Sequence, residues 1–380
     1  MKFVVAPDKY KGSLSGAEFY DAVEHGIKRV FPNATIIKKP LADGGDGTID
    51  VIRDYLKAEE IEVLVRDPLF NLIKAKYLYS EQKKTAFIEM SEASGYRLLT
   101  NNDLNCRLTT SLGTGELIAD ALDKGAEQII LGIGGSATND GGMGIAVALG
   151  YEFLGEKNHI LTPIGENLIK VKTISKAKAD KRLEKVQLKV ACDVNNPFYG
   201  PEGAAYVYAP QKGATAEDVN FLDKGLEHFA KALNTEFGVD VQKIPGSGAA
   251  GGVGGGSVVF LNATLNSGID LVKEIADFEN AIEQANWIIT GEGKLDNQTF
   301  SGKTIFGVVE SAKKKNIPVA AFCGAIELTL EEQESMGITY ASSVLKNVGS
   351  FDEAVKSSYE NLEFAAFNFA RILKRDITLI

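Results

Sequence analysis

Residues 132–142 have the sequence Gly-Ile-Gly-Gly-Ser-Ala-Thr-Asn-Asp-Gly-Gly and join an apolar run at 128–131 to a helical pattern at 143–149. This order predicts a strand, a tight loop and the N-terminus of a helix. Unpaired backbone N–H groups and the positive end of the helix dipole meet at such a junction, so we expect it to bind an anion, most simply a phosphate. The alternative for this segment alone is a glycine-rich turn with a helix cap. The residues expected to contact nucleotide phosphates are Gly134, Gly135, Ser136, Thr138, Asn139 and Asp140.

The alternation of strand and helix patterns differs along the chain. The patterns at both ends of the chain predict strand, loop and helix in turn, whereas the pattern of residues 61–90 predicts successive strands of an antiparallel meander. The chain has 380 residues, more than one hydrophobic core usually holds. We therefore predict an α/β fold with two domains. Residues 1–60 and 275–380 form a doubly wound parallel sheet, and residues 61–274 form an inserted α/β domain with a mixed sheet.

Charge and cysteine content exclude several classes of partner. The formal net charge of −10 argues against binding to nucleic acid or to an anionic membrane surface. The three cysteines contain no C-x-x-C pair, so neither a disulfide framework nor a thiolate zinc site is indicated. We expect a protein of the reducing cytoplasm without a transmembrane segment.

Five glycine-rich segments end a strand or begin a helix beside an acid or a lysine, at 7–13, 43–48, 132–142, 246–256 and 291–303. Ligands of open α/β sheets bind at the C-terminal ends of the strands, so we expect these segments to converge in a cleft between the domains. The segment 246–256 is expected to be a ligand loop or lid. Glycine loops hold phosphates, lysines neutralise them, and carboxylates bind Mg²⁺ or accept a proton. The combination predicts phosphoryl transfer.

Two other functions remain as alternatives. Gly132, Gly134 and Ala137 resemble a dinucleotide fingerprint, but the acid expected about 20 residues later is missing, so an oxidoreductase is the weaker alternative. A non-catalytic nucleotide-binding or anion-binding regulatory protein is the other, although the loops keep their acids and lysines. The segment 297–304 lacks the first glycine of a Walker motif.

Individual polar residues follow the predicted strand ends. Asp193 comes just after the strand at 187–191 and could be only a turn former, but its place at a strand end favours function. Lys11 precedes Gly12 and Ser13 at a helix start, which favours contact with an anion. Glu292 and Asp296 are either magnesium ligands or an ordinary acidic loop.

Taken together, these segments resemble the type-1 glycerate kinase family, and the similarity extends over essentially the whole chain. The segments that carry it are 6–13, 42–48, 113–116, 132–142, 191–197, 210–214, 246–252 and 290–296. The sequence departs from the family pattern at Lys9-Tyr10, where Ser-Phe is frequent, and at Asp46, where Glu is common. The resemblance implies phosphorylation of D-glycerate with ATP and Mg²⁺. It also implies a flavodoxin-like domain joined to a second α/β domain, with the active site between them.

We accordingly expect a kinase that uses ATP and D-glycerate, and a homodimer remains open. Asp193 is expected to orient or deprotonate the acceptor hydroxyl, with Lys11 as the second catalytic residue. Glu292 and Asp296 are expected to hold Mg²⁺. The residues expected to bind the substrate are Asp8, Ser13, Asp43, Gly44 and Gly45. Whether the 2- or the 3-hydroxyl reacts is left open, and the resemblance favours 2-phosphoglycerate.

Overall fold

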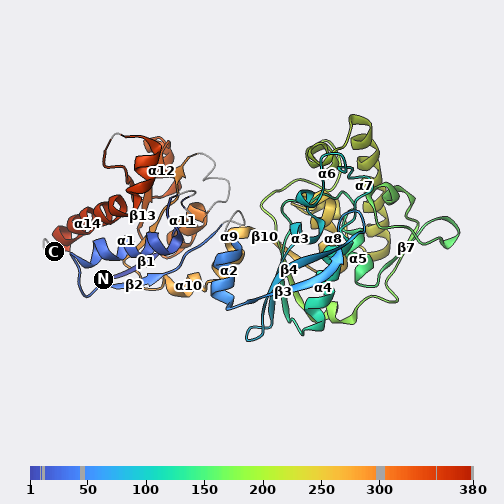
Figure 1. The fold of residues 1–380 in the computed structure, drawn as a ribbon, viewed down its shortest axis with the longest axis horizontal. Helices are drawn as coiled ribbons and strands as arrows, with labels where there is room; N and C mark the ends of the chain where they lie inside the picture. Colours follow the sequence, from blue (N-terminus) through green and yellow to red (C-terminus); the bar gives the residue numbers. More distant parts are fainter. Residues whose placement is uncertain (9, 11–12, 43–47, 297–303, 348, 378–380) are drawn as a thin grey trace. The chain divides into compact units, whose positions relative to one another are not determined.

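The computed structural model describes residues 1–8, 10, 13–42, 48–296, 304–347 and 349–377. The chain forms two compact units (Figure 1). The first, here called the termini unit, comprises Met1–Tyr55 and Gly268–Ile380, and the second, the inserted unit, comprises Leu56–Ser267. Each unit has its own sheet and its own hydrophobic core.

The termini unit contains a five-stranded parallel sheet in the order β15-β13-β11-β1-β2. Its strands are β1 (Lys2–Val5), β2 (Thr35–Lys38), β11 (Trp287–Thr290), β13 (Val319–Cys323) and β15 (Tyr340–Ser343). Phe3 on β1 lies opposite Trp287 on β11, so the two ends of the chain share one sheet. Numbered along the chain, the strand order is that of a flavodoxin-like, doubly wound sheet. The fold class predicted for this unit is therefore confirmed.

Helix α1 (Gly16–Lys28) shows why the helices of this unit form where they do. Ser15 caps it in a capping box with Glu18, and its apolar stripe is buried against α14 (Ser358–Ile377). A Cβ atom at Gly26 would lie 2.4 Å from the carbonyl oxygen of Glu363, so this close helix contact requires glycine. The sequence pattern at 351–373 predicts one helix, but the structure has two, α13 (Phe351–Lys356) and α14. The remaining elements are α2 (Thr48–Leu56), α9 (Gly268–Ile275), α10 (Phe278–Ala281), α11 (Thr304–Lys314), α12 (Leu330–Met336) and the paired strands β12 (Lys294–Leu295) and β14 (Ala325–Ile326).

The inserted unit contains a six-stranded mixed sheet in the order β10-β9-β6-β5-β4-β3. Strands β3 (Glu59–Arg66), β4 (Leu72–Ser80) and β5 (Thr85–Glu89) are antiparallel neighbours. From β5 onward β6 (Gln128–Gly132), β9 (Gln187–Ala191) and β10 (Thr264–Asn266) run parallel. The predicted mixed sheet is confirmed, and β5 joins its two halves.

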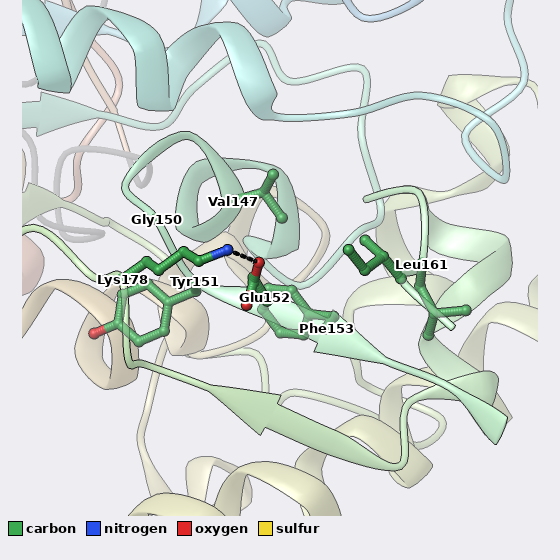
Figure 2. A pocket seen from close by; sticks show the side chains of 8 residues that line it. Val147, Gly150, Tyr151, Glu152, Phe153, Leu161 and Lys178 are labelled. Carbon is green, nitrogen blue, oxygen red and sulfur yellow. Dashed lines mark hydrogen bonds and ion pairs between the residues drawn. The ribbon is translucent and has the colours of Figure 1, made fainter. Parts of the chain in front are cut away.

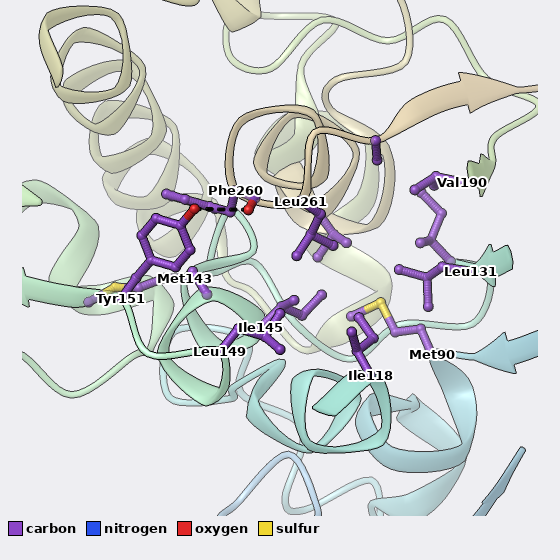
Figure 3. Packing of buried hydrophobic residues seen from close by; sticks show 14 of the residues in the cluster. Met90, Ile118, Leu131, Met143, Ile145, Leu149, Tyr151, Val190, Phe260 and Leu261 are labelled. Carbon is purple, nitrogen blue, oxygen red and sulfur yellow. Dashed lines mark hydrogen bonds between the residues drawn. The ribbon is translucent and has the colours of Figure 1, made fainter. Parts of the chain in front are cut away.

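The core of the inserted unit lies between this sheet and helices α4 (Leu112–Asp123), α5 (Met143–Ala148), α7 (Ala216–Phe237) and α8 (Ala249–Leu261). Figure 3 shows buried side chains of β6 and β9 packed with residues of α4, α5 and α8. The hydroxyl of Tyr151 donates a hydrogen bond of 3.0 Å to the carbonyl oxygen of Phe260 within this core. Shorter elements are α3 (Ser91–Ser94), α6 (Ala204–Tyr208) and the antiparallel pair β7 (Glu152–Leu154) and β8 (Thr173–Ser175). In the described part of the chain, every helix is too short or too polar to cross a membrane.

The glycine-rich segment 246–256 is not the open loop that its composition predicts. The bounds of α8 include residues 249–256, but Ala250, Gly251 and Gly252 have positive φ and form a kink, and the regular helix follows them. The glycines allow close packing, because a Cβ atom at Gly256 would lie 2.2 Å from the carbonyl oxygen of Gly141. Tertiary contacts therefore override the low helix propensity of glycine. The segment is buried and is therefore not an open lid, while its contact with a ligand stays a prediction.

Candidate functional site

Three neighbouring strands of the inserted unit end at the same edge of the sheet. Gly132 at the end of β6 lies opposite Glu89 of β5 and opposite Ala191 of β9. The segments that follow β6 and β9 therefore leave the sheet side by side, at its C-terminal edge. This edge is where open α/β sheets bind ligands.

The segment after β6 divides into an exposed part and a buried part. Gly134 and Gly135 are exposed, and a Cβ atom at Gly134 would meet no other atom within 4 Å. Gly135 has a φ of +68°, which glycine adopts without strain. In contrast, Thr138, Asn139 and Asp140 are fully buried. Only the exposed part presents backbone to a ligand in solution.

The N-terminus of α5 does not offer the unpaired N–H groups that the sequence predicts. The carboxylate of Asp140 accepts hydrogen bonds of 3.1 Å from the N–H groups of Gly142 and Gly144. The N–H group of Ile145 donates to the hydroxyl of Ser111 at 3.1 Å. These N–H groups therefore already donate to acceptors inside the protein, and a phosphate could bind there only by replacing those acceptors. The expected anion site at this helix start is corrected to the exposed residues before it.

Asp140 holds this region together from the inside. Its carboxylate also accepts hydrogen bonds from the N–H group and the hydroxyl of Ser111, at 2.8 and 2.7 Å. Burial raises the pKa of Asp140, and the hydrogen bonds from Ser111, Gly144 and Gly142 oppose that rise. The carboxylate of Asp140 is thus buried and occupied by protein groups, which does not support the predicted contact with nucleotide.

The side chains of Thr138 and Asn139 are also remote from solvent. The Thr138 hydroxyl and both polar atoms of the Asn139 amide have no hydrogen-bond partner among the residues that the structure describes. Gly251 at the start of α8 covers them, because a Cβ atom there would lie 2.1 Å from the Thr138 carbonyl oxygen. The prediction of phosphate contact is therefore best supported for the exposed Gly134 and Gly135, next to the buried Ser136.

Lys212 is a candidate site residue that the sequence interpretation did not select. It is 2% exposed, and its ammonium donates hydrogen bonds of 2.7 Å to the Ser136 hydroxyl and to the Thr138 carbonyl oxygen. Burial lowers the pKa of Lys212 to about 8, and the neighbouring Cys106 and Asp140 oppose that change. The available signal was the order Pro210, Lys212, Gly213, which fixes a lysine in a short turn.

The segment after β9 carries Asp193, which is exposed, and is held by its neighbours further along. The side chain of Asn196 donates to the carbonyl oxygen of Glu202 at 2.8 Å and accepts from the Tyr208 hydroxyl at 2.6 Å. The N–H group of Gly248 donates to the Asn196 carbonyl oxygen at 3.0 Å. The segment that contains Asp193 is therefore anchored to the start of α8.

The start of α8 also contacts the segment after β6. The N–H group of Gly141 donates a hydrogen bond of 3.0 Å to the carbonyl oxygen of Gly251. The ring of Phe198 fills the space beside Gly141, Gly252 and Gly255, where added Cβ atoms would lie 3.4, 2.9 and 2.8 Å from it. The segments after β6 and β9 and the glycine-rich start of α8 thus converge within the inserted unit.

Two carboxylates follow adjacent strands of the termini unit. Asp8 comes after β1, and its N–H group donates to the carbonyl oxygen of Gly291 at 2.9 Å. The hydroxyl of Thr304, at the start of α11, donates to the Asp8 carboxylate at 2.7 Å. Glu292 follows β11 and is 7% exposed. The ends of β1 and β11 thus bring Asp8 and Glu292 to one edge of the sheet.

The other predicted residues of this unit are less fully placed. Asp296 lies beyond β12, with its carboxylate 3.8 Å from the Lys294 ammonium, and Ser13 is half-buried before α1. Lys11, Asp43, Gly44 and Gly45 lie outside the described residues. Within the described ranges, no group of three or more His, Cys, Asp or Glu residues could hold a metal ion. Mg²⁺ needs no such group, because it often binds one or two carboxylates together with substrate phosphates.

A pocket of about 270 Å³ lies at the other end of α5 (Figure 2). The Lys178 ammonium and the Glu152 carboxylate form an ion pair of 2.7 Å at this pocket. Its lining residues are Val147, Gly150, Tyr151, Glu152, Phe153, Ile160, Leu161 and Lys178. None of the predicted site residues belongs to it.

Comparison with known proteins gives matches over the full length of the chain. The model of the glycerate kinase family matches residues 3–374. A glycerate kinase of Halalkalibacterium halodurans is 44% identical over 367 residues, covering 97% of both chains. A glycerate 2-kinase of Escherichia coli is 40% identical and covers 98% of both chains. The crystal structure of a protein named glycerate kinase 2 from Salmonella typhimurium LT2 superposes with a TM-score of 0.87 at 40% identity, covering 100% of this chain and 99% of that one.

Proposed function

Because the chain belongs to the glycerate kinase family, we propose that it transfers the γ-phosphoryl group of ATP to a hydroxyl group of D-glycerate. The observation that carries the proposal is the arrangement at one sheet edge of the inserted unit. Exposed backbone at Gly134 and Gly135 follows β6, exposed Asp193 follows the neighbouring β9, and Lys212 lies buried beneath Ser136. Backbone N–H groups for phosphate and a carboxylate for a hydroxyl are the two elements that such a reaction needs.

We assign the nucleotide phosphates to the exposed backbone of Gly134 and Gly135, and contact with the buried Ser136 remains a prediction. Phosphoryl transfer passes through a loose transition state, so the protein mainly positions the reactants and stabilises charge. The segment after β6 suits this task because its buried part is hydrogen-bonded on both sides. Asp193 is assigned to the acceptor hydroxyl, which it orients or deprotonates.

We assign Mg²⁺ to Glu292, with Asp296 as the second candidate ligand. Glu292 fits because it is a buried oxygen donor at a strand end, the kind of ligand that Mg²⁺ prefers. Asp296 supports the assignment less, since its carboxylate faces the Lys294 ammonium. When bound, Mg²⁺ neutralises charge on the β- and γ-phosphates. The catalytic role of Lys11 and the substrate-binding roles of Asp8, Ser13, Asp43, Gly44 and Gly45 remain predictions.

The motif set supports two finer proposals. The first is that the chain belongs to the type-1 group of the family, which its glycine-rich segments resemble. The second is that the product is 2-phosphoglycerate, which this resemblance favours. The E. coli relative is named a glycerate 2-kinase, which supports the same position.

The test is to measure ADP formation with Mg²⁺ and ATP in the presence of D-glycerate, L-glycerate or no acceptor. We expect turnover only with D-glycerate, and phosphorus NMR of the product then distinguishes 2- from 3-phosphoglycerate. ADP formation at the same rate with and without D-glycerate would show that the proposed activity is wrong. A 3-phosphoglycerate product would overturn only the assignment of the hydroxyl.

A further inference from the structure

We propose that Lys212 is the positioning residue of the nucleotide site, holding Ser136 and Thr138 so that the backbone of Gly134 and Gly135 faces the phosphates of ATP. The inference rests on the proposed function and adds a residue to it. Lys212 does not touch the reacting atoms in this account. It acts through the segment that follows β6.

Lys212 is held in place by the fold of its own turn. It ends a single 3₁₀ turn, Pro210–Lys212, and is followed by Gly213 with a φ of +88°. A Cβ atom at Gly213 would lie 2.3 Å from the carbonyl oxygen of Leu104, so this turn packs tightly against the preceding chain. With 2% exposure, the side chain has none of the freedom of a surface lysine. The ammonium is therefore fixed relative to the sheet edge.

The ammonium binds two positions of one segment. Its acceptors, the Ser136 hydroxyl and the Thr138 carbonyl oxygen, are both 2.7 Å away. Hydrogen bonds that involve a charged donor are roughly twice as strong as neutral ones, so the pair restrains the backbone immediately after Gly135. In the described part of the chain, its third N–H group has no hydrogen-bond acceptor. Lys212 therefore fixes the beginning of the buried part.

Asp140 fixes the other end of the buried part. Its carboxylate accepts from Ser111, Gly142 and Gly144, so Ser136 to Asp140 lie between a buried cation and a buried anion. Burying charged groups is costly unless they are paired or hydrogen-bonded; here the Asp140 carboxylate accepts four hydrogen bonds and the Lys212 ammonium donates two.

The experiment measures ATP binding directly, by isothermal titration calorimetry with Mg²⁺ and no glycerate. We expect Lys212→Met to raise the Kd for ATP about tenfold or more, and Ser136→Ala to raise it about threefold. In steady-state assays, the KM for ATP should rise in both variants, while the KM for D-glycerate stays within about twofold of wild type.

Lys273→Met provides the matched control. Lys273 is also a buried lysine, 7% exposed, and it bonds to the Gly307 carbonyl oxygen at 3.3 Å and to Asp270 at 2.9 Å in the termini unit. We expect this variant to lower Tm without changing the Kd for ATP, which separates loss of a buried lysine from loss of positioning.

Two outcomes would overturn the proposal. One is a folded Lys212→Met protein that binds ATP as wild type does. The other is an equal rise of the KM values for ATP and D-glycerate, which a general structural defect would cause. If Lys212→Met does not fold, the Ser136→Ala variant provides the test. An unchanged Kd for ATP in that variant would contradict the positioning role of Lys212. Because binding is measured without glycerate, failure of the proposed reaction and failure of this inference give different results.

Discussion

The carboxylate of Asp140 and the hydroxyl of Ser111 are 2.7 Å apart in a fully buried contact, and this contact joins the residues that precede α4 and α5. The same hydroxyl accepts from the N–H group of Ile145. Ser111→Ala leaves both groups short of a partner, so we expect it to lower the free energy of unfolding by about 1–3 kcal/mol. Urea denaturation measures this loss. Ser335→Ala, at an exposed serine bonded to Glu332, is the control and should change it by less than about 0.5 kcal/mol.

Asp193→Asn tests the assigned base. The substitution keeps size and turn-forming contacts but removes the charge, so we expect kcat to fall by about 10² or more with Tm and ATP affinity unchanged. Steady-state kinetics and calorimetry give these values. If kcat stays within about threefold of wild type, Asp193 is only a turn former and Asp296 becomes the better candidate.

Affinity for ATP should depend on pH through Lys212, whose pKa is lowered to about 8 by burial. As pH rises through 8 the ammonium loses its charge, so the KM for ATP should rise in wild type and stay flat in Lys212→Met. Of the two groups that face it, Asp140 is a buried acid, and the pKa of Cys106 is raised to about 11, chiefly by burial, so the thiol stays neutral in this range. If the KM for ATP changed with pH in the same way in wild type and in Lys212→Met, the pH dependence could not be assigned to Lys212.

Stability should change with pH in the opposite direction to affinity. The folded-state pKa of about 8 lies below the ordinary value of 10.5, so the unfolded chain binds more protons between these two pH values. The contribution of Lys212 to the free energy of unfolding therefore rises with pH from about 8 to about 10.5 and is lost as pH falls through 8. Urea titrations of wild type and Lys212→Met across this window measure the difference.

Gly251 and Gly238 form a matched pair with φ values of +70° and +71°. An added Cβ atom meets nothing within 4 Å at Gly238 but lies 2.1 Å from the Thr138 carbonyl oxygen at Gly251. Gly238→Ala should therefore cost only the backbone strain of about 1–2 kcal/mol. Gly251→Ala should cost at least about 1–3 kcal/mol more, because α8 must move. Equal unfolding free energies for the two variants would show that this packing is looser than described.

Glu292→Gln tests the magnesium assignment. The amide keeps the shape but lacks the charge that Mg²⁺ prefers, so we expect the Mg²⁺ concentration for half-maximal activity to rise about tenfold. Glu327→Gln is the control, because this carboxylate is exposed and pairs with Lys294 at 2.8 Å. If both variants reached half-maximal activity at the same Mg²⁺ concentration, Glu292 would not be a magnesium ligand.

Much of the fold follows from local signals in the sequence. Ser15 with Glu18 and Thr215 with Asp218 form capping boxes, so the starts of α1 and α7 are encoded within a few residues. The strand at Lys2–Val5 is recognisable from its apolar run. The C-terminal edges of both sheets could be anticipated because the polar residues follow the strands directly.

The remaining features depend on contacts between distant residues. The composition of segment 246–256 predicts a loop because glycine has low helix propensity, and the packing of these glycines against Gly141 and Phe198 explains why part of the segment joins α8. The sequence alone predicts that Asp140 binds phosphate. The structure shows that its carboxylate instead accepts a hydrogen bond from Ser111, 29 positions earlier in the chain. The contact between Lys212 and Ser136 could not be predicted from the sequence, because the residues of a short turn do not determine which distant side chains it contacts.

The pairing of β1 with β11 has a consequence for biosynthesis. Lys2 bonds to Asn286, 284 positions later, so the first strand leaves the ribosome long before its central neighbour exists. At typical translation rates that wait is roughly 15–60 s. The inserted unit, which has its own sheet and its own core, is synthesised in full during this interval, whereas the nascent β1 still lacks its partner β11. A pause or truncation after residue 267 would thus release a finished inserted unit attached to an unfinished sheet.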